Sequence, residues 1–156
     1  MSGEGIIYLM RHADAVAGEV DAERALSERG RAQVSRVCET LRRAGGFSPA
    51  EIWHSPLVRA RETAELLASG LGLQAPLKLV PGLEPDDDPA AIAARLSGLA
   101  ESVALVGHEP HMGVLASLMV RGPGESPVYF PFPKAGVLAL VRSGKEWRSE
   151  WRVRAP

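Results

Sequence analysis

Apolar residues along the chain gather in short uninterrupted runs, separated by longer segments in which they recur every three or four positions. The runs at 6–10 and 102–107 contain no charged residue, which is typical of strands buried on both faces of a sheet. The segments "AEIWH" at 50–54 and "PLKLV" at 76–80 indicate two further short strands. The segments between the runs have the spacing of amphipathic helices, so the pattern predicts strands and helices in alternation.

The first helix is predicted to follow Ser27, a favourable N-cap, and to stop at Gly45-Gly46. Helical spacing places four small or apolar residues on one face: Val34, Val37, Cys38 and Leu41. We interpret Cys38 as a small core residue rather than a reactive thiol.

Three more helices are predicted from their start signals. In the first of them Ser55 is the expected N-cap and Pro56 the first helical residue, and the helix is expected to run to about residue 71. Asp88 and Pro89 give the same signal for the next helix, and Pro110 begins the last.

The C-terminal segment 136–153 reads as two strands joined by a turn at 143–145. Strict alternation predicts that the last strand has one aromatic-rich and one charged face. The first would hold Trp147, Ser149, Trp151 and Val153, and the second Arg148, Glu150, Arg152 and Arg154. A nucleic-acid platform could use such a pattern, but a half-buried edge strand explains it without a partner.

Strands that alternate with helices predict a three-layer α/β fold with a mostly parallel central sheet and helices on both faces. Ligands of such sheets bind beyond the carboxyl ends of the strands. Arg11-His12 and Gly107-His108 both follow a buried strand. We therefore expect these pairs to meet at one edge of the sheet, provided that their strands are neighbours.

Composition narrows the class of protein. The chain has 156 residues, 46% of them hydrophobic and 24% charged, with a formal net charge of −1 and one cysteine. These values predict a single domain over residues 1–156 in a reducing, cytoplasmic setting, without a disulfide, a membrane segment or a nucleic-acid partner.

Four side chains suit phosphoryl chemistry. Arg11 and Arg59 can neutralise phosphoryl oxygens, and Arg59 lies near the predicted start of a helix, where anions are favoured. Arg61 is expected on a different helix face. Of the two imidazoles, His12 and His108, one can attack phosphorus while the other donates to the same oxygens.

The motifs "LMRHADA" at 9–15, "SPLVRARETA" at 55–64 and "ALVGHEPHMG" at 104–113, in this order, resemble the histidine phosphatase superfamily, which has a phosphoglycerate-mutase-like fold. The short chain and the "RHADA" and "GHEP" variants are most similar to its small bacterial phosphohistidine phosphatases. The segment "RALSERGRAQ" at 24–33 resembles the stretch that follows the first motif there. The resemblance extends over residues 6–141.

The resemblance implies that His12 is the nucleophile that becomes phosphorylated, and that Arg11, Arg59 and His108 complete the phosphate pocket. It implies a reaction without a metal or organic cofactor. One departure is Ala13, because the superfamily usually has glycine after the first histidine; we expect alanine to be tolerated.

The second departure concerns the proton donor that ester-cleaving relatives use. Glu84 is the candidate in the acidic loop 80–89, although acidic residues near a helix start are also favourable for dipole reasons alone. A phosphoramidate substrate needs the acid less, because imidazole leaves readily. We therefore expect the substrate to be a phosphorylated protein of the histidine-phosphotransfer or phosphotransferase-system type, with inorganic phosphate as the product.

Three other functions stay open from the sequence. A phosphatase of small phosphate esters, or a mutase, would use the same site. A metal-dependent hydrolase could use His108 and His111, and a non-catalytic module would only bind phosphate. Asp14 could orient Arg11 or His12 or lie at the surface, His111 could line the rim of the pocket, and Lys134 could be an extra phosphate contact or a solvated lysine.

Overall fold

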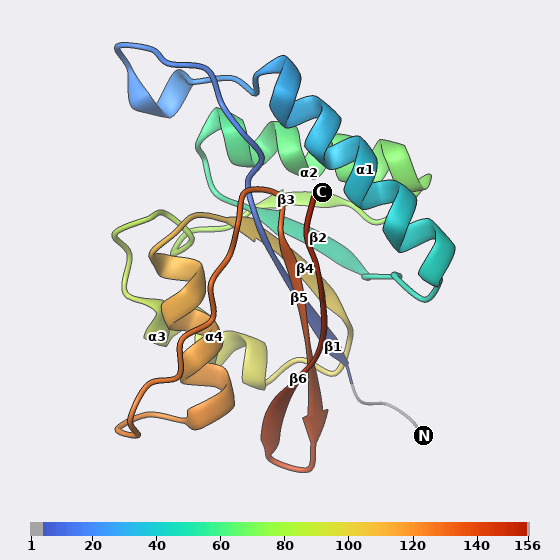
Figure 1. Ribbon diagram of the computed structural model, residues 1–156. Coiled ribbons are helices and arrows are strands. Elements are labelled where there is room, and N and C mark those ends of the chain that lie inside the picture. The colour runs from blue at the N-terminus through green and yellow to red at the C-terminus, as the bar shows by residue number, and fades with distance from the viewer. Residues whose placement is uncertain (1–4, 156) are drawn as a thin grey trace.

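The computed structural model describes residues 5–155, in which six strands form one mixed sheet with helices on both faces (Figure 1). The strands are β1 (Ile6–Arg11), β2 (Glu51–His54), β3 (Leu77–Leu79), β4 (Val103–Gly107), β5 (Val137–Ser143) and β6 (Glu146–Val153). The helices are η1 (Asp21–Glu23), α1 (Glu28–Ala44), α2 (Val58–Leu71), α3 (Pro89–Ser97) and α4 (His111–Arg121). This confirms the predicted α/β class.

The sheet has the order β3-β2-β4-β1-β5-β6, and its first four strands are parallel to one another. β1 is parallel to β4, with Arg11 opposite Gly107. The two strands that precede the histidines are therefore neighbours, and His12 and His108 follow them at the same edge. β5 and β6 add an antiparallel hairpin on the other side of β1.

Alternate residues of the buried strands enter two separate cores. On β1, Ile7 and Leu9 pack with residues of α3 and α4, whereas Tyr8 and Met10 pack with residues of α1 and α2. Each helix pair accordingly covers one face of the sheet, as Figure 1 shows. Burial of each large side chain contributes about 1.5–3 kcal/mol, so the strand ends that carry the site rest on a well-packed layer.

α1 begins where the sequence predicts it, directly after Ser27. Ser27 Oγ accepts the N–H of Gly30 at 3.0 Å, as an N-cap should, and the predicted apolar face is buried. Gly30 packs directly on the chain that follows β1: a Cβ on this residue would lie 2.0 Å from the carbonyl oxygen of Asp14. Only glycine fits at this contact.

The start of α2 differs from the prediction. The helix begins at Val58, with Leu57 rather than Ser55 at the N-cap position, so Pro56 lies before the helix. Ser55 Oγ accepts the N–H of Leu57 at 3.3 Å and also lies 2.6 Å from His108 Nε2. The serine hydroxyl is thus engaged by the histidine that follows β4, which the local cap signal could not reveal.

The predicted faces of β6 are wrong beyond Glu150. The register shifts there, because Ala139 pairs with Trp151 whereas the next residue, Leu140, pairs with Ser149. This bulge leaves Glu150 as an extra residue and exchanges the two faces of the strand from that point on. Trp147 lies in the core on the α3 and α4 side, but Trp151 stacks near Tyr8 on the opposite side, with ring centroids 5.9 Å apart.

No helix within residues 5–155 has both the length and the apolar character needed to traverse a bilayer.

Candidate active site

His12 is held at the end of β1 by its backbone and by its ring. Its amide N–H donates to the carbonyl of Gly107 on β4 at 2.9 Å. Its Nδ1 lies 2.7 Å from the carbonyl oxygen of Ala13, which can only accept, so Nδ1 carries a proton. Burial, together with the charges of Arg59 and Arg11, lowers the pKa of His12 to about 4, although the hydrogen bond to Ala13 acts in the opposite direction. The ring is therefore neutral at pH 7, with an unprotonated Nε2.

Ala13 keeps an ordinary backbone at the position where glycine was expected. Among residues 5–155, the non-glycine residue with a positive φ is Ala135, at 62°, so alanine at position 13 is not strained. The N–H of Ala13 donates to Thr63 Oγ1 at 3.1 Å, and Thr63 Oγ1 donates to the carbonyl of Arg59 at 2.7 Å. One hydroxyl thus ties the chain beside His12 to the first turn of α2.

His108 lies beside His12, with ring centroids 5.1 Å apart. Burial lowers its pKa to about 3, and the neighbouring His12 and Arg59 add to this effect. Ser55 accepts the N–H of Leu57, so its own hydroxyl hydrogen is free to donate to His108 Nε2. In that arrangement the ring proton of neutral His108 lies on Nδ1; this atom is buried and has no hydrogen-bond partner within residues 5–155.

The two arginines approach from different elements. Arg11 donates from one amino group to the carbonyl of Phe132 at 2.9 Å, while its buried Nε has no partner in the described part of the chain. Arg59, in the first turn of α2, is 5% exposed and donates to the backbone oxygen of Asp21 at 3.0 Å and to its Oδ2 at 3.1 Å. Both guanidinium groups act on the His12 ring, so the site is electropositive.

Glu84 is exposed on the loop between β3 and α3. Its backbone N–H is bonded to Asp87 Oδ2 at 2.8 Å, and no hydrogen bond or ion pair joins its side chain to the other four predicted residues. The structure therefore brings together His12, His108, Arg11 and Arg59, and the role of Glu84 as an acid stays a prediction.

Asp14 contacts neither Arg11 nor His12 through its carboxylate. Its Oδ2 accepts the hydroxyl of Ser27 at 2.6 Å, and its Oδ1 accepts Lys134 Nζ at 2.8 Å. These contacts hold the pKa of Asp14 below its ordinary value. Asp14 thus anchors the start of α1, and Lys134 is paired with it rather than simply solvated.

His111 does not line the rim of the pocket, because it is 1% exposed and neither ring nitrogen has a hydrogen-bond partner within residues 5–155. Burial lowers its pKa. In the same residues no group of three or more histidine, cysteine, aspartate or glutamate side chains is arranged to hold a metal ion. The pair His108 and His111 therefore lacks further ligands.

Three residues of the site were not identified as such from the sequence. Ser55 was interpreted only as a cap, and Thr63 and Asp21 were not singled out. Thr63 lies four residues after Arg59, one helical turn on, so its contact could have been inferred from spacing. Asp21 has no such signal, because it lies 38 residues from Arg59 in a short exposed turn.

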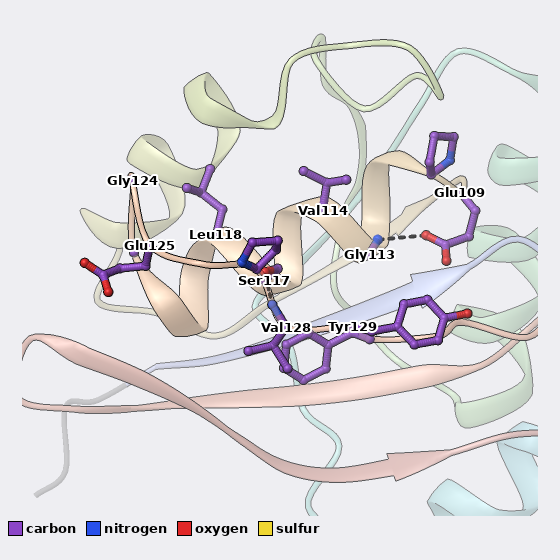
Figure 2. A pocket seen from close by; sticks show the side chains of 13 residues that line it. Glu109, Gly113, Val114, Ser117, Leu118, Gly124, Glu125, Val128 and Tyr129 are labelled. Carbon is purple, nitrogen blue, oxygen red and sulfur yellow. Dashed lines mark hydrogen bonds between the residues drawn. The ribbon is translucent and has the colours of Figure 1, made fainter.

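Two hollows adjoin the site and meet at Glu109, the residue after His108. One is an apolar groove of about 480 Å³ between α4 and the segment 122–130, and Figure 2 shows it with Val114, Leu118 and Tyr129 on its walls. The other, of about 550 Å³, is lined by Arg11 and by residues of β5 and β6. Glu109 itself is turned toward α4, where its Oε1 accepts the N–H of Gly113 at 2.7 Å (Figure 2).

Comparison with known proteins points to one family. The model of the histidine phosphatase superfamily (branch 1) matches residues 7–84. The chain is 28% identical over 143 residues to the phosphohistidine phosphatase SixA of Escherichia coli, an alignment that covers 88% of this chain and 87% of the relative.

Solved structures share the fold over nearly the whole chain. The protein histidine phosphatase SixA complexed with tungstate superimposes with a TM-score of 0.83 at 24% identity, over 96% of this chain and 97% of that one. The α-ribazole phosphatase from Shigella flexneri does so with a TM-score of 0.76 at 18% identity, over 97% and 96% of the two chains. With the family model matched across both β1 and α2, the chain belongs to the histidine phosphatase superfamily.

Proposed function

We propose that the protein hydrolyses phosphohistidine on another protein through a covalent intermediate on His12. In the first step the lone pair of His12 Nε2 attacks phosphorus, and the P–N bond to the substrate imidazole breaks. In the second step water attacks the phosphoryl group, the bond to His12 breaks, and inorganic phosphate leaves. The observation that carries the proposal is the hydrogen bond from His12 Nδ1 to Ala13, which leaves Nε2 unprotonated.

The other three residues would stabilise the charge that develops on the phosphoryl oxygens. Arg11 Nε and His108 Nδ1 are buried and have no partner within residues 5–155, and His108 Nδ1 would be a donor when Ser55 donates to Nε2. Arg59 would exchange the carboxylate of Asp21 for a phosphoryl oxygen. Donors already fixed in a site where water is restricted are the largest single contribution to many enzymatic rates, and each is worth about 2.7–4 kcal/mol.

The proposed substrate class rests on two supports. The relative at 28% identity is a phosphohistidine phosphatase that matches this chain nearly end to end. The chemistry also fits, because no hydrogen bond or ion pair joins the exposed Glu84 side chain to the four site residues, and a phosphoramidate bond requires less help from an acid than an ester bond.

Small phosphate esters are the second candidate substrate class. The fold of the α-ribazole phosphatase covers nearly the whole of both chains, so the short length of this protein does not by itself exclude a small substrate. A comparison of kcat/KM between a phosphohistidine protein and a panel of small phosphate esters separates the two. A large preference for the panel would overturn the proposed substrate class.

The covalent step is tested by trapping. Wild-type protein mixed with a phosphohistidine peptide and quenched in alkaline denaturant, which preserves phosphohistidine, should carry phosphate on His12 in peptide mass spectra. His12→Asn should bind inorganic phosphate, keep its cooperative thermal unfolding and lose turnover by at least about three orders of magnitude. Turnover in folded His12→Asn, or phosphate on another residue, would contradict the mechanism.

A further inference from the structure

The second hollow beside the site is basic. It has a volume of about 550 Å³, and three arginines, Arg11, Arg152 and Arg154, line it together with Glu109. Arg11 thus faces both the candidate phosphate site and this cavity, whereas the other two arginines come from the end of the chain. β6 ends close to the carboxyl edge of the parallel strands in Figure 1.

Strand register explains how distant residues meet here. Met10 on β1 pairs with Val137 on β5, and Val137 pairs with Val153 on β6. One residue further along, Arg11 and Arg154 lie on either side of Gly136, whose carbonyl accepts the N–H of Arg11. Adjacent strands are about 4.8 Å apart, so the two arginines are separated by roughly two strand spacings, with no side chain between them.

The bulge at Glu150 determines which face these arginines occupy. Because of the shifted register, Arg152 pairs with Leu138, which lies in the core on the α3 and α4 side. If the pairing continued regularly beyond Ser149, with Glu150 opposite Ala139, Trp151 would pair with Leu138, and Arg152 would point to the opposite face. Bulges commonly re-aim side chains beside functional sites, and this one directs Arg152 and Arg154 into the cavity.

The charges of the cavity are poorly balanced. Neither Arg152 nor Arg154 forms an ion pair with any residue in the range 5–155. The one carboxylate present, Glu109, is bonded to the first turn of α4. The cavity therefore presents an excess of guanidinium groups, which are suited to bind a carboxylate with two parallel hydrogen bonds.

We propose that this basic cavity binds an acidic side chain that lies near the phosphohistidine on the substrate protein. The inference rests on the proposed function and adds a determinant of its specificity. It favours a protein over a small ester because the cavity continues into the apolar groove at Glu109 and Tyr129, and the groove exposes 84% of Tyr129 and 52% of Val114. Together the two hollows form an elongated surface with a charged and an apolar part.

The test uses two phosphohistidine peptides that are identical except for glutamate or glutamine at the positions flanking the phosphohistidine. Wild-type protein should cleave the glutamate peptide with about tenfold higher kcat/KM, mainly through a lower KM. Arg152→Glu should remove this preference, and the double variant Arg152→Glu/Arg154→Glu should reverse it. Arg148→Glu is the matched control, because Arg148 is an exposed arginine on the same strand that pairs with Val141 and does not line the cavity.

A substrate without a carboxylate separates recognition from catalysis. Turnover of phosphoramidate, which has the scissile P–N bond but no carboxylate, should be the same in wild type and in Arg152→Glu. The inference would be overturned if Arg152→Glu lost as much turnover on phosphoramidate as on the glutamate peptide. It would also be overturned if Arg148→Glu had the same effect as Arg152→Glu, since the effect would then reflect the net charge of the protein alone. A stronger effect of Arg152→Glu on small carboxylated phosphate esters than on the glutamate peptide would overturn the assignment to a protein partner.

The two peptides also distinguish failure of the proposed function from failure of the inference about the cavity. If wild-type protein cleaved neither peptide, both the proposed function and the inference that rests on it would fall. If it cleaved the glutamate and glutamine peptides equally well, the proposed function would stand and the basic cavity would have no part in recognition.

Discussion

Replacing Ser55 by alanine should impair the site through His108. Ser55 Oγ lies 2.6 Å from His108 Nε2 and is fully buried, and His108 itself is 1% exposed, so no solvent can replace the lost hydroxyl. A buried polar group left without its partner costs about 1–3 kcal/mol. We propose that the hydroxyl donates to Nε2 and so holds the ring proton on Nδ1; without it, part of the population would have the proton on Nε2 instead.

We therefore expect Ser55→Ala to lower kcat/KM by about tenfold, which corresponds to about 1.4 kcal/mol of transition-state stabilisation. The inhibition constant of inorganic phosphate should rise in parallel, because His108 would no longer present a donor in every molecule. Nitrogen-15 NMR of the histidine rings should show the proton on Nδ1 of His108 in wild type and a mixture of tautomers in the variant.

Ser117→Ala provides the control. Ser117 is also a buried serine, and its Oγ accepts the N–H of Val128 at 2.9 Å in the apolar groove. Its loss should lower the free energy of unfolding without changing the inhibition by phosphate. Wild-type kcat/KM and phosphate inhibition in Ser55→Ala would refute the reasoning, whatever the change in stability.

Two further predictions concern pH and packing. Burial lowers the pKa values of His12 and His108 to about 4 and about 3. We therefore expect kcat/KM, corrected for ionisation of the substrate, to stay nearly constant from pH 7 to 5. If the catalytic histidine had its ordinary pKa of about 6.5, kcat/KM would fall about thirtyfold at the acidic end of this range. In the unfolded chain these rings take up protons near pH 6.5, so the free energy of unfolding, measured by urea titration, should fall by a few kcal/mol as pH drops from about 6.5 to 4; a rise would contradict the assigned burial. Gly30→Ala should lower both thermal stability and kcat/KM, because its Cβ would lie 2.0 Å from the Asp14 oxygen beside His12, whereas Gly98→Ala, with no atom closer than 3.7 Å, should be nearly neutral.

Much of the fold follows from local signals in the sequence. The apolar runs and the cap residues Ser27 and Asp88 predict elements that the structure confirms, since strand burial and helix capping depend on residues close in sequence. The meeting of His12 and His108 could also be predicted, because parallel strands end at one edge and β1 and β4 proved to be neighbours.

Contacts that depend on tertiary packing could not be read in the same way. Ser55 has a favourable cap signal, but a buried histidine 53 residues away binds its hydroxyl instead. The pairing of Asp21 with Arg59 joins an exposed turn to a helix, and no periodicity connects them. The bulge at Glu150 also has no signal in the sequence of β6, because it is visible only when β6 is aligned against β5.

The bulge in β6 also determines how this strand would respond to a change in its length. Deletion of the extra residue Glu150 would restore regular pairing, because Trp151 would still lie opposite Ala139 and Arg152 opposite Leu138. The indole beside Tyr8 and the guanidinium groups of the cavity would then keep their faces of the sheet. The bulge is thus a position at which the strand can lose one residue without losing either surface.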